Sequence, residues 1–340
     1  MFAAERRKLL VRRIARDGRL DVTEMARELG VSAMTVRRDL ATLAHDDRIR
    51  RVHGGAVSAE RTADSGARIG LMVPDVDYYY RDVVAGAEEA ARRSGHGLVV
   101  ATHFYDIDLE KDRLARITGI AIDALIICTS GHDTVADDQA IRRLQTQWPH
   151  PIVLAERTLD QPHVGEPLSL VETDHRHGAL LALHHLLAHG HDRVAALISA
   201  TPTGRHLPAA LTMAAHQLNI RVDLHELPRT QTPRTATVTH QCLDQGISAL
   251  FVHSDLTAAS VLDTVLARGL RVPEDVHLVS WDDVVAQRHA VPLTAVSPAR
   301  RAIGAEAVRL AAARIDHPDA PIVRTTILPR LVVRRSSPRA

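Results

Sequence analysis

From Arg68 onward the sequence alternates short, fully apolar runs with longer segments of helical periodicity. Strands that are apolar on both faces belong in a parallel sheet that helices cover on both sides. The pattern therefore predicts an α/β fold, and because nine runs are too many for one comfortable doubly wound sheet, we expect two lobes. The runs are RIGLMV, GLVVAT, DALIIC, PIVLAE, SLVETD, RVAALIS, SALFVH, VHLVSW and PLTAVS, and the expected helices are Val83–Ser94, Asp174–His189, Thr235–Asp244, Asp255–Arg268 and Ala299–Ile315.

The N-terminal part predicts two short helices joined by a glycine. In Val22–Leu29 apolar residues recur at helical spacing, and Gly30 then permits a tight turn. The next segment, Val31–Leu40, contains Ser32, whose hydroxyl can cap a helix, and keeps its apolar residues on one face. A further helical stripe covers Phe2–Arg16 and braces the pair. Two short helices joined in this way are typical of a helix-turn-helix.

A basic hairpin is predicted to follow. Ile49–Val57 alternates apolar with basic residues and includes the pair Gly54-Gly55, which suits a hairpin tip. Residues 1–57 hold 13 Lys and Arg against 8 Asp and Glu, a net charge of +5, whereas the remainder holds 29 against 33, a net charge of −4. A basic excess confined to one segment indicates a reader of nucleic acid. The expected DNA contacts are Ser32, Thr35, Arg37 and Arg38 of the second helix, and Arg50, Arg51 and His53 of the wing.

These residues resemble the winged helix-turn-helix of DeoR-type bacterial regulators. The resemblance runs from Glu5-Arg6 through Arg37-Arg38-Asp39-Leu40 to His53-Gly54-Gly55, with Asp47 where the family usually turns through glycine. It implies binding to double-stranded operator DNA. The following residues, 58–67, are small and polar without apolar periodicity, which predicts a flexible linker.

From Arg68 to Ser337 the order of motifs resembles the effector domain of the lac repressor/galactose repressor family, which is similar to a periplasmic sugar-binding protein. The motifs include GLMVPDVDYYYRDVV, DALIICTS, PIVLAER, VETDHRHGALLALHHLLAHGHDRVAALIS, SDLTAASVL, SWDDV and LPRLVVRRSS. The resemblance implies two parallel, Rossmann-like sheets with several crossings between lobes. The expected domains are a winged helix-turn-helix over 1–57, a linker over 58–67 and an effector domain over 68–340, with one lobe near 68–166 and 297–322 and the other near 167–296 and 323–336.

Aromatic and acidic side chains follow two of the apolar runs. The chain has only nine aromatic residues, yet Tyr78, Tyr79 and Tyr80 follow the first run and Trp281 precedes Asp282 after another. Ligands of parallel sheets bind at the carboxyl ends of strands, where aromatic faces stack on sugars and carboxylates accept hydroxyls. This composition predicts a site for a small polyol or sugar. The alternative is that the tyrosines close the core or a dimer face and that Asp282 forms a turn.

The family resemblance implies similar roles at matching positions. Glu156 and Arg157 match an acidic and basic pair that binds hydroxyls, and Ser254 stands where the family usually has Asn. The family's ligand-binding arginine aligns without a gap to Leu207, and Arg205 lies two residues earlier, so either Arg205 or no arginine serves the ligand. The implied effector-binding residues are Asp77, Tyr78, Tyr79, Tyr80, Glu156, Arg157, Arg205, Asp255, Trp281 and Asp282.

Several classes of site and location are disfavoured. His185 and His189 lie four apart with His184 and His191 nearby, but no HExxH accompanies them, so we expect a solvated helix face and no metal. No GxSxG, Walker loop or GxGxxG occurs, so neither an enzyme nor a cofactor is expected. The two cysteines have no CxxC spacing, and neither an export signal nor a long apolar run is present. We therefore expect a cytoplasmic protein.

The sequence thus predicts a ligand-responsive transcription regulator, most simply a repressor. A homodimer would place two reader helices on a palindromic operator, and a small sugar-like effector between the lobes would relieve repression. Because residues 59–66 contain Gly66 and no apolar stripe, we expect no hinge helix that inserts into DNA. The alternative is a cytoplasmic sugar-binding protein or sugar-processing enzyme without a DNA role.

Overall fold

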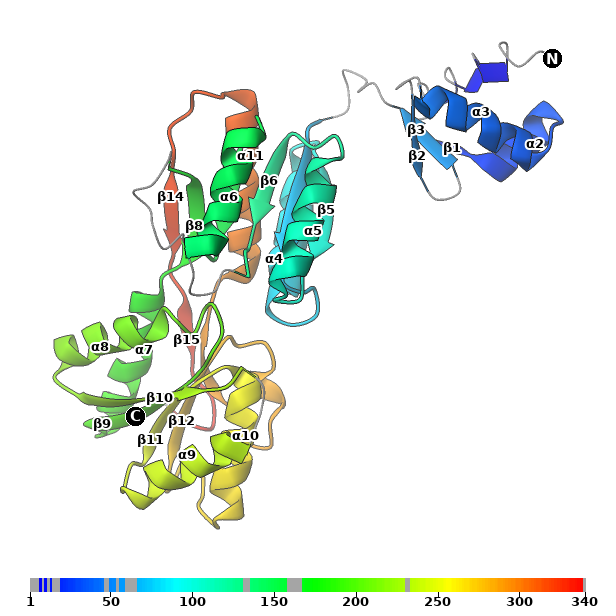
Figure 1. Cartoon of the computed structure of the whole chain (residues 1–340). Coiled ribbons are helices and arrows are strands. Elements are labelled where there is room, and N and C mark those ends of the chain that lie inside the picture. Colours follow the sequence, from blue (N-terminus) through cyan, green and yellow to red (C-terminus); the bar gives the residue numbers. More distant parts are fainter. Residues whose placement is uncertain are drawn as a thin grey trace. The chain divides into compact units, whose positions relative to one another are not determined.

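The structure, a computed structural model, divides the chain into two compact units, Met1–Gly66 and Ala67–Ala340 (Figure 1). Most of the expected linker, and with it the expected absence of a helix over 59–66, lies outside the described residues. No helix among the residues described is both long and apolar enough to cross a membrane. The structure describes residues 6–7, 9–10, 13, 19–45, 49–52, 55–58, 66–130, 135–157, 167–229 and 233–338.

The first unit contains the two expected short helices and a small antiparallel sheet. Helix α2 begins after Asp21, whose carboxylate accepts the N–H groups of Thr23 and Glu24 at 2.8 and 3.0 Å. It ends at Gly30, which has φ of 63°, a left-handed value that glycine adopts without steric cost. Apolar residues from both helices, including Met25, Val36 and Leu40, form one core. The elements are β1 (Arg19–Asp21), α2 (Val22–Leu29), α3 (Ala33–His45), β2 (Ile49–Val52) and β3 (Gly55–Ser58), with strand order β1-β3-β2.

The second unit has two six-stranded sheets, which confirms the predicted two-lobed α/β fold. Neighbouring strands of the first sheet are all parallel, in the order β14-β8-β7-β6-β4-β5. Alternate residues of β4 enter different cores: Leu71 packs in one apolar cluster and Met72 in another. Both faces are therefore covered, which explains why the strand is apolar throughout. The elements of this lobe are β4 (Arg68–Val73), α4 (Tyr79–Arg93), β5 (Gly97–Thr102), α5 (Ile107–Thr118), β6 (Ala124–Ile127), α6 (Val135–Gln147), β7 (Ile152–Ala155), β8 (Ser169–Thr173), α11 (Arg300–Asp316) and β14 (Arg324–Ile327).

The second lobe repeats this design. Its strand order is β10-β9-β11-β12-β13-β15, parallel except for β15, which runs antiparallel to β13. Phe251 and Val252 of β11 lie in separate apolar clusters, so this sheet is also covered on both faces. The elements are α7 (His175–Ala188), β9 (Arg193–Ser199), α8 (Leu207–Leu218), β10 (Arg221–Leu227), α9 (Pro233–Asp244), β11 (Ala249–His253), α10 (Asp255–Ala267), β12 (His277–Trp281), β13 (Thr294–Ser297) and β15 (Arg330–Val332), with a short 3₁₀ turn at Ala286–Arg288.

The expected points at which the chain changes lobes were wrong by one strand in two places. Both β8 and β14, assigned from the sequence to the second lobe, belong to the first sheet. The parallel ladder continues without a break, since Leu154 is paired with Leu170 and the N–H of Glu156 donates to the carbonyl of Val171 at 2.8 Å. The chain therefore crosses after β8, between β13 and α11, and between β14 and β15.

Candidate functional site

The start of α3 is organised by two hydroxyls. The Ser32 hydroxyl accepts the N–H of Thr35 at 3.1 Å, and the two side-chain oxygens lie 2.9 Å apart. This capping contact begins the helix at the predicted place. Val36 faces the core, whereas the side chains of Arg37 and Arg38 are exposed.

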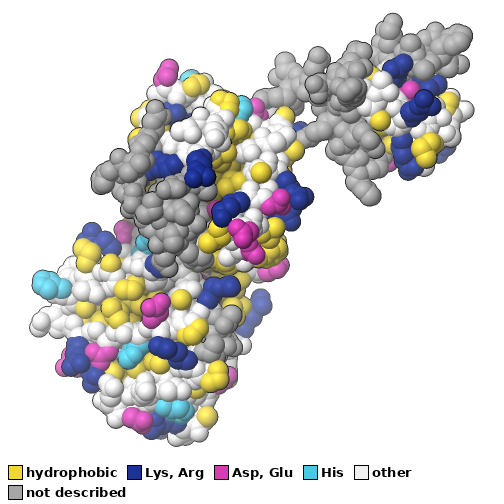
Figure 2. All heavy atoms as spheres, viewed as in Figure 1, with side chains coloured by type: hydrophobic (Ala, Val, Ile, Leu, Met, Phe, Trp, Pro, Cys, Tyr) yellow, Lys and Arg dark blue, Asp and Glu magenta, His cyan; other side chains and the backbone are white. Residues whose placement is uncertain are grey.

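The exposed face of α3 carries positive charge that the described residues leave uncompensated. Asp39 is buried and pairs with Arg6, which ties α3 to the first helical residues. Among the described residues neither Arg37 nor Arg38 forms an ion pair. Basic side chains are visible on the described surface of this unit (Figure 2). Of the expected wing contacts, Arg50 and Arg51 lie on β2 with side chains outside the described set, and His53 is itself outside it.

In the second unit, expected site residues meet where the carboxyl ends of the strands of both lobes face one another. The Tyr78 hydroxyl donates to a carboxylate oxygen of Asp282 at 3.2 Å, and these residues belong to different lobes. Burial, followed by the negative charge of Asp255, raises the pKa of Asp282 well above its usual value. A second bridge joins the guanidinium of Arg157 to the hydroxyl of Thr203 at 3.3 Å.

The tyrosines next to Tyr78 fix the expected acidic and basic pair in place. The Tyr79 hydroxyl donates to Glu156 at 2.5 Å, and Thr173 donates to the same carboxylate through its N–H and its hydroxyl. The Arg157 guanidinium donates to the Tyr80 hydroxyl at 2.7 Å. The structure places these expected site residues next to one another, and protein donors engage the Glu156 carboxylate.

Asp255 supports a loop. Its buried carboxylate accepts the Ser280 hydroxyl at 2.7 Å and the N–H groups of Val284, Val285 and Ala286 at 2.7, 3.0 and 3.2 Å. Four donors fill its acceptor sites. The structure therefore assigns Asp255 to the positioning of the loop that follows Asp282.

Trp281 is fully buried and packs inside the second lobe. Its ring stacks on His175 with centroids 5.7 Å apart, and His206 follows at 5.2 Å from His175. Burial lowers the pKa of both His175 and His206 to about 4 and that of His253 to about 3. The Nε1 of Trp281 is buried without a hydrogen-bond partner among the described residues. With these lowered pKa values, the imidazoles of His175, His206 and His253 are neutral at pH 7.

The remaining predicted positions are less central. Asp77 is exposed, and its N–H donates to Asp75 at 3.2 Å. Leu207, at the start of α8, is fully buried in the apolar core, so its side chain is not exposed to a ligand. Arg205 lies two residues earlier in the turn before α8 and is partly exposed.

Arg300, which the sequence analysis missed, connects the two lobes. From the first turn of α11 it pairs with Asp82 at 3.3 Å and lies 5.7 Å from the ring centre of Tyr79. It also donates to the carbonyl groups of Asp282 and Asp283, the latter at 3.3 Å. In the sequence Arg300 is the first of two consecutive arginines at a helix start. Nothing in that pattern indicates a contact with the other lobe.

The histidines of α7 form internal contacts. His184 is exposed as expected, but the expectation of a solvated face was wrong for His185 and His189. His185 contacts Ser337 at 2.8 Å, and the ring of His189 lies 4.8 Å from that of His277, which is also hydrogen-bonded to His191 at 2.9 Å. Within the described ranges, no three metal-ligating side chains are arranged to hold a metal ion.

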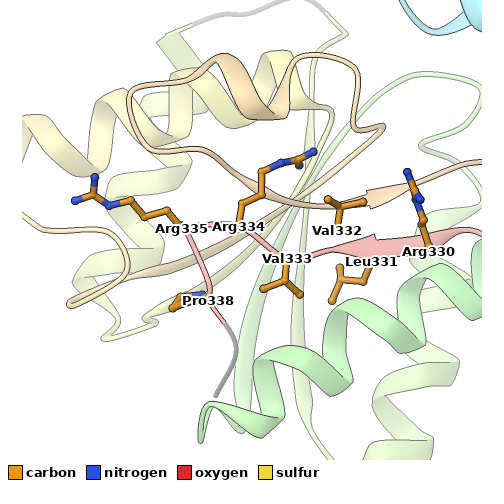
Figure 3. A pocket seen from close by; sticks show the side chains of 7 residues that line it. All are labelled: Arg330, Leu331, Val332, Val333, Arg334, Arg335 and Pro338. Atoms are coloured by element: carbon orange, nitrogen blue, oxygen red, sulfur yellow. The ribbon is translucent and has the colours of Figure 1, made fainter.

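A cavity of about 650 Å³ runs along β15 and the following tail, outside the expected effector set. Figure 3 shows Leu331 and Val333 pointing to the side opposite Arg330 and Arg334. Leu331 packs on the apolar core, and Arg334 pairs with Asp283 at 2.7 Å. The cavity is thus lined by residues that hold the end of the chain on the second lobe.

Known protein families match part of each unit. Residues 6–62 match the DeoR-like helix-turn-helix domain, and residues 183–337 match the periplasmic binding protein-like domain. The chain joins a DeoR-like helix-turn-helix domain to a periplasmic binding protein-like domain. Both resemblances expected from the sequence are thereby confirmed.

Known relatives align with this chain over most of their length. The transcriptional regulator DegA of Bacillus subtilis is 24% identical over 93% of this chain and 97% of its own. The transcriptional regulator GalR of Escherichia coli is 25% identical over 93% of this chain and 95% of its own. A solved complex of the transcriptional regulator CelR with cellobiose is 25% identical, covers 90% of this chain and 91% of its own, and has a TM-score of 0.68. The relatives named here are transcriptional regulators.

Proposed function

We propose that this protein is a cytoplasmic transcriptional repressor whose affinity for operator DNA is controlled by a small uncharged, hydroxylated metabolite bound between the two lobes. The observation that supports this most strongly is the union, in one chain, of a DeoR-like helix-turn-helix domain with a periplasmic binding protein-like domain. We propose no catalytic reaction, since the relatives named above are transcriptional regulators.

DNA recognition is assigned to α3. Thr35, Arg37 and Arg38 lie on its first two turns, and the arginines point away from the core. A helix that presents exposed guanidinium groups fits the major groove, where arginine binds guanine through two hydrogen bonds. A homodimer is part of the proposal, since two such helices read the two halves of a palindromic operator.

An uncharged effector is favoured because the guanidinium of Arg157, between the lobes, is already hydrogen-bonded to protein oxygens. Arg157 donates to four protein oxygens, on Thr129, Glu156, Thr203 and Tyr80. A phosphate would have to break these contacts and would lie near the Asp282 carboxylate. Ligand hydroxyls, by contrast, can donate to Asp282 directly. The cellobiose complex of CelR is an example of such a ligand in a similar protein.

The DNA proposal is tested by mobility shift with duplexes from the genomic neighbourhood of the coding sequence. Arg37→Ala and Arg38→Ala are each expected to weaken binding about 5- to 150-fold if the side chain reads a base. Arg92→Ala, which removes an exposed arginine of α4 in the other unit, is the matched control and should leave binding unchanged. If the wild-type protein retards none of these duplexes, with or without sugars, the regulator assignment is wrong.

The ligand proposal is tested by a thermal-shift screen of matched pairs such as D-glucose and glucose 6-phosphate, together with D-ribose and cellobiose. A ligand that binds only the folded protein raises Tm with the logarithm of its concentration. We expect an uncharged sugar to stabilise the wild type and Asp282→Ala to abolish that shift. Stabilisation by the phosphorylated member alone would contradict the proposed ligand class.

A further inference from the structure

Tyr78 occupies a defined position in the first lobe. It precedes α4, and its N–H donates to the carboxylate of Asp75 at 3.2 Å, which also accepts the N–H of Asp77. Its ring packs against the apolar core that includes Tyr79 and Tyr80. Burial, followed by the charge of Asp282, raises the pKa of the Tyr78 phenol above its ordinary value. The hydroxyl is therefore protonated and available as a donor.

Asp282 is held equally firmly on the second lobe. Its φ of 106° is rare for a residue with a side chain, and its N–H donates to the carbonyl of Val296 at 3.1 Å. Asp255, also on the second lobe, anchors the three N–H groups that begin at Val284, whereas Arg300 reaches the Asp282 carbonyl from the first lobe. The Asp282 carboxylate thus faces the first lobe from a rigid support.

The contact between them lies across the lobes. In the described part of the chain, Tyr78 is the one side chain that donates to the Asp282 carboxylate. The Tyr78 hydroxyl donates an O–H to Asp282, as a sugar hydroxyl would, so both would use the same carboxylate acceptor. Other side chains of the described residues also bridge the lobes: Arg157 contacts Thr203 at 3.3 Å, Arg229 lies 5.4 Å from the ring centre of Tyr105, and the Tyr78 phenol also has a side-chain hydrogen bond with Ser254.

We propose that the Tyr78–Asp282 hydrogen bond is an internal latch: Tyr78 closes the lobes on each other and competes with the effector for Asp282. This inference rests on the proposed function only in its second part, the competition. Closure by Tyr78 requires no ligand. The effector binds by displacing the phenol. The measured Kd therefore equals the intrinsic Kd divided by the fraction of molecules in which the latch is open.

The latch is tested without ligand in the full-length protein. Spin labels at Asp108→Cys in α5 and Glu274→Cys, both exposed positions on different lobes, report the distance between lobes. The natural cysteines are buried and stay unlabelled. Tyr78→Phe should increase the ratio of open to closed molecules roughly two- to tenfold, as expected for the loss of one hydrogen bond. Tyr105→Phe keeps the ring that Arg229 covers and removes a hydroxyl that does not contact Asp282, so it should give the wild-type distribution.

The same hydrogen bond should appear in a double-mutant cycle. Asp282→Ala is expected to open the lobes as Tyr78→Phe does, and the double variant should open no further than either single variant. A distance distribution of Tyr78→Phe that is identical to that of the wild type overturns the latch, as does full additivity of the two substitutions.

Competition is tested by calorimetric titration with D-ribose, D-glucose and cellobiose. Tyr78→Phe should bind the accepted sugar roughly two- to tenfold more tightly than the wild type, and Tyr105→Phe should bind it equally. Unchanged or weaker binding by Tyr78→Phe overturns the competition. If no sugar binds either protein while Tyr78→Phe still opens the lobes, the latch is supported and the ligand class of the proposed function is wrong.

Discussion

Gly86 of α4 and Gly304 of α11 allow these two helices to touch backbone to backbone. A Cβ on Gly86 would lie 2.0 Å from the carbonyl oxygen of Arg301, and a Cβ on Gly304 would lie 1.9 Å from that of Val83. Because the residue before Arg301 is Arg300, this close approach also determines where the Arg300 guanidinium reaches Tyr79 and the Asp282 loop. Helix packing in the first lobe therefore supports the contacts between lobes.

Replacing Gly304 by alanine should force α4 and α11 apart. We expect the free energy of unfolding to fall by about 1–3 kcal/mol, the usual effect of overpacking in a core. Urea denaturation measures it. Gly97→Ala is the matched control, because a Cβ there would meet only the Arg68 side chain at 3.9 Å. Equal stability of Gly304→Ala and the wild type would show that the helices can separate without cost.

Asp255→Ala should destabilise the protein, although the family resemblance implied a ligand contact at this position. The substitution leaves buried donors, including the N–H groups of Val284 and Val285, without their acceptor. We expect a loss of about 3 kcal/mol in urea denaturation, since each unsatisfied buried donor costs about 1–3 kcal/mol. Asp263→Ala, which removes an exposed carboxylate from the same helix, is the control. A stable Asp255→Ala protein that only loses ligand would restore the original assignment.

The fold was predictable wherever a strand is buried on both faces. The nine apolar runs all form strands. Eight of them lie in the interior of a sheet that helices cover on both faces, whereas β5 lies at an edge and is partly exposed but still keeps an apolar sequence. The strands that were missed, β1, β10, β14 and β15, each lie at the edge of a sheet. An edge strand such as RVDLHEL is partly exposed and keeps polar residues, so it lacks the apolar signal.

Several of the residues expected at the site lie close together, but their individual contacts could not be predicted. The residues after the runs do meet, yet the partners of Tyr79 and Tyr80 lie 77 positions away in the sequence. No local pattern reveals that Glu156 is engaged by Tyr79 and Thr173, or that Arg300 reaches across the lobes. Such roles depend on long-range geometry, which periodicity and composition do not encode.

The turn between α2 and α3 should require a residue that tolerates a left-handed backbone. Gly30 has φ of 63°, and a Cβ at this position would have no other atom within 4 Å, so alanine would be strained without clashing. Gly30→Ala should therefore destabilise this unit by about 1–2 kcal/mol, and Gly30→Asn by less. Hydrogen exchange of the α2 and α3 amides measures the effect. Faster exchange in both variants to the same extent would contradict the backbone explanation.

Stability should fall as the pH decreases below 6.5, because several buried histidines remain neutral in the folded protein. The pKa of His253 is lowered by burial to about 3, whereas an exposed histidine of the unfolded chain titrates near 6.5. Above pH 6.5 neither state binds the proton, so the residue has no effect there. Between about 6.5 and 3 the unfolded state alone binds it, and stability decreases with falling pH.

His253→Gln removes this titration and should flatten the pH dependence. Between pH 7.5 and pH 5 the variant should lose about 2 kcal/mol less free energy of unfolding than the wild type, because the proton taken up by unfolded His253 is worth that much. Urea denaturation at the two pH values gives the difference. His216→Gln, at an exposed position of α8, should keep the wild-type slope. The slope is the decisive quantity, since a change of packing at Gln shifts stability equally at both pH values. Parallel slopes for His253→Gln and the wild type would mean that the pKa of His253 is the same in the folded and unfolded protein.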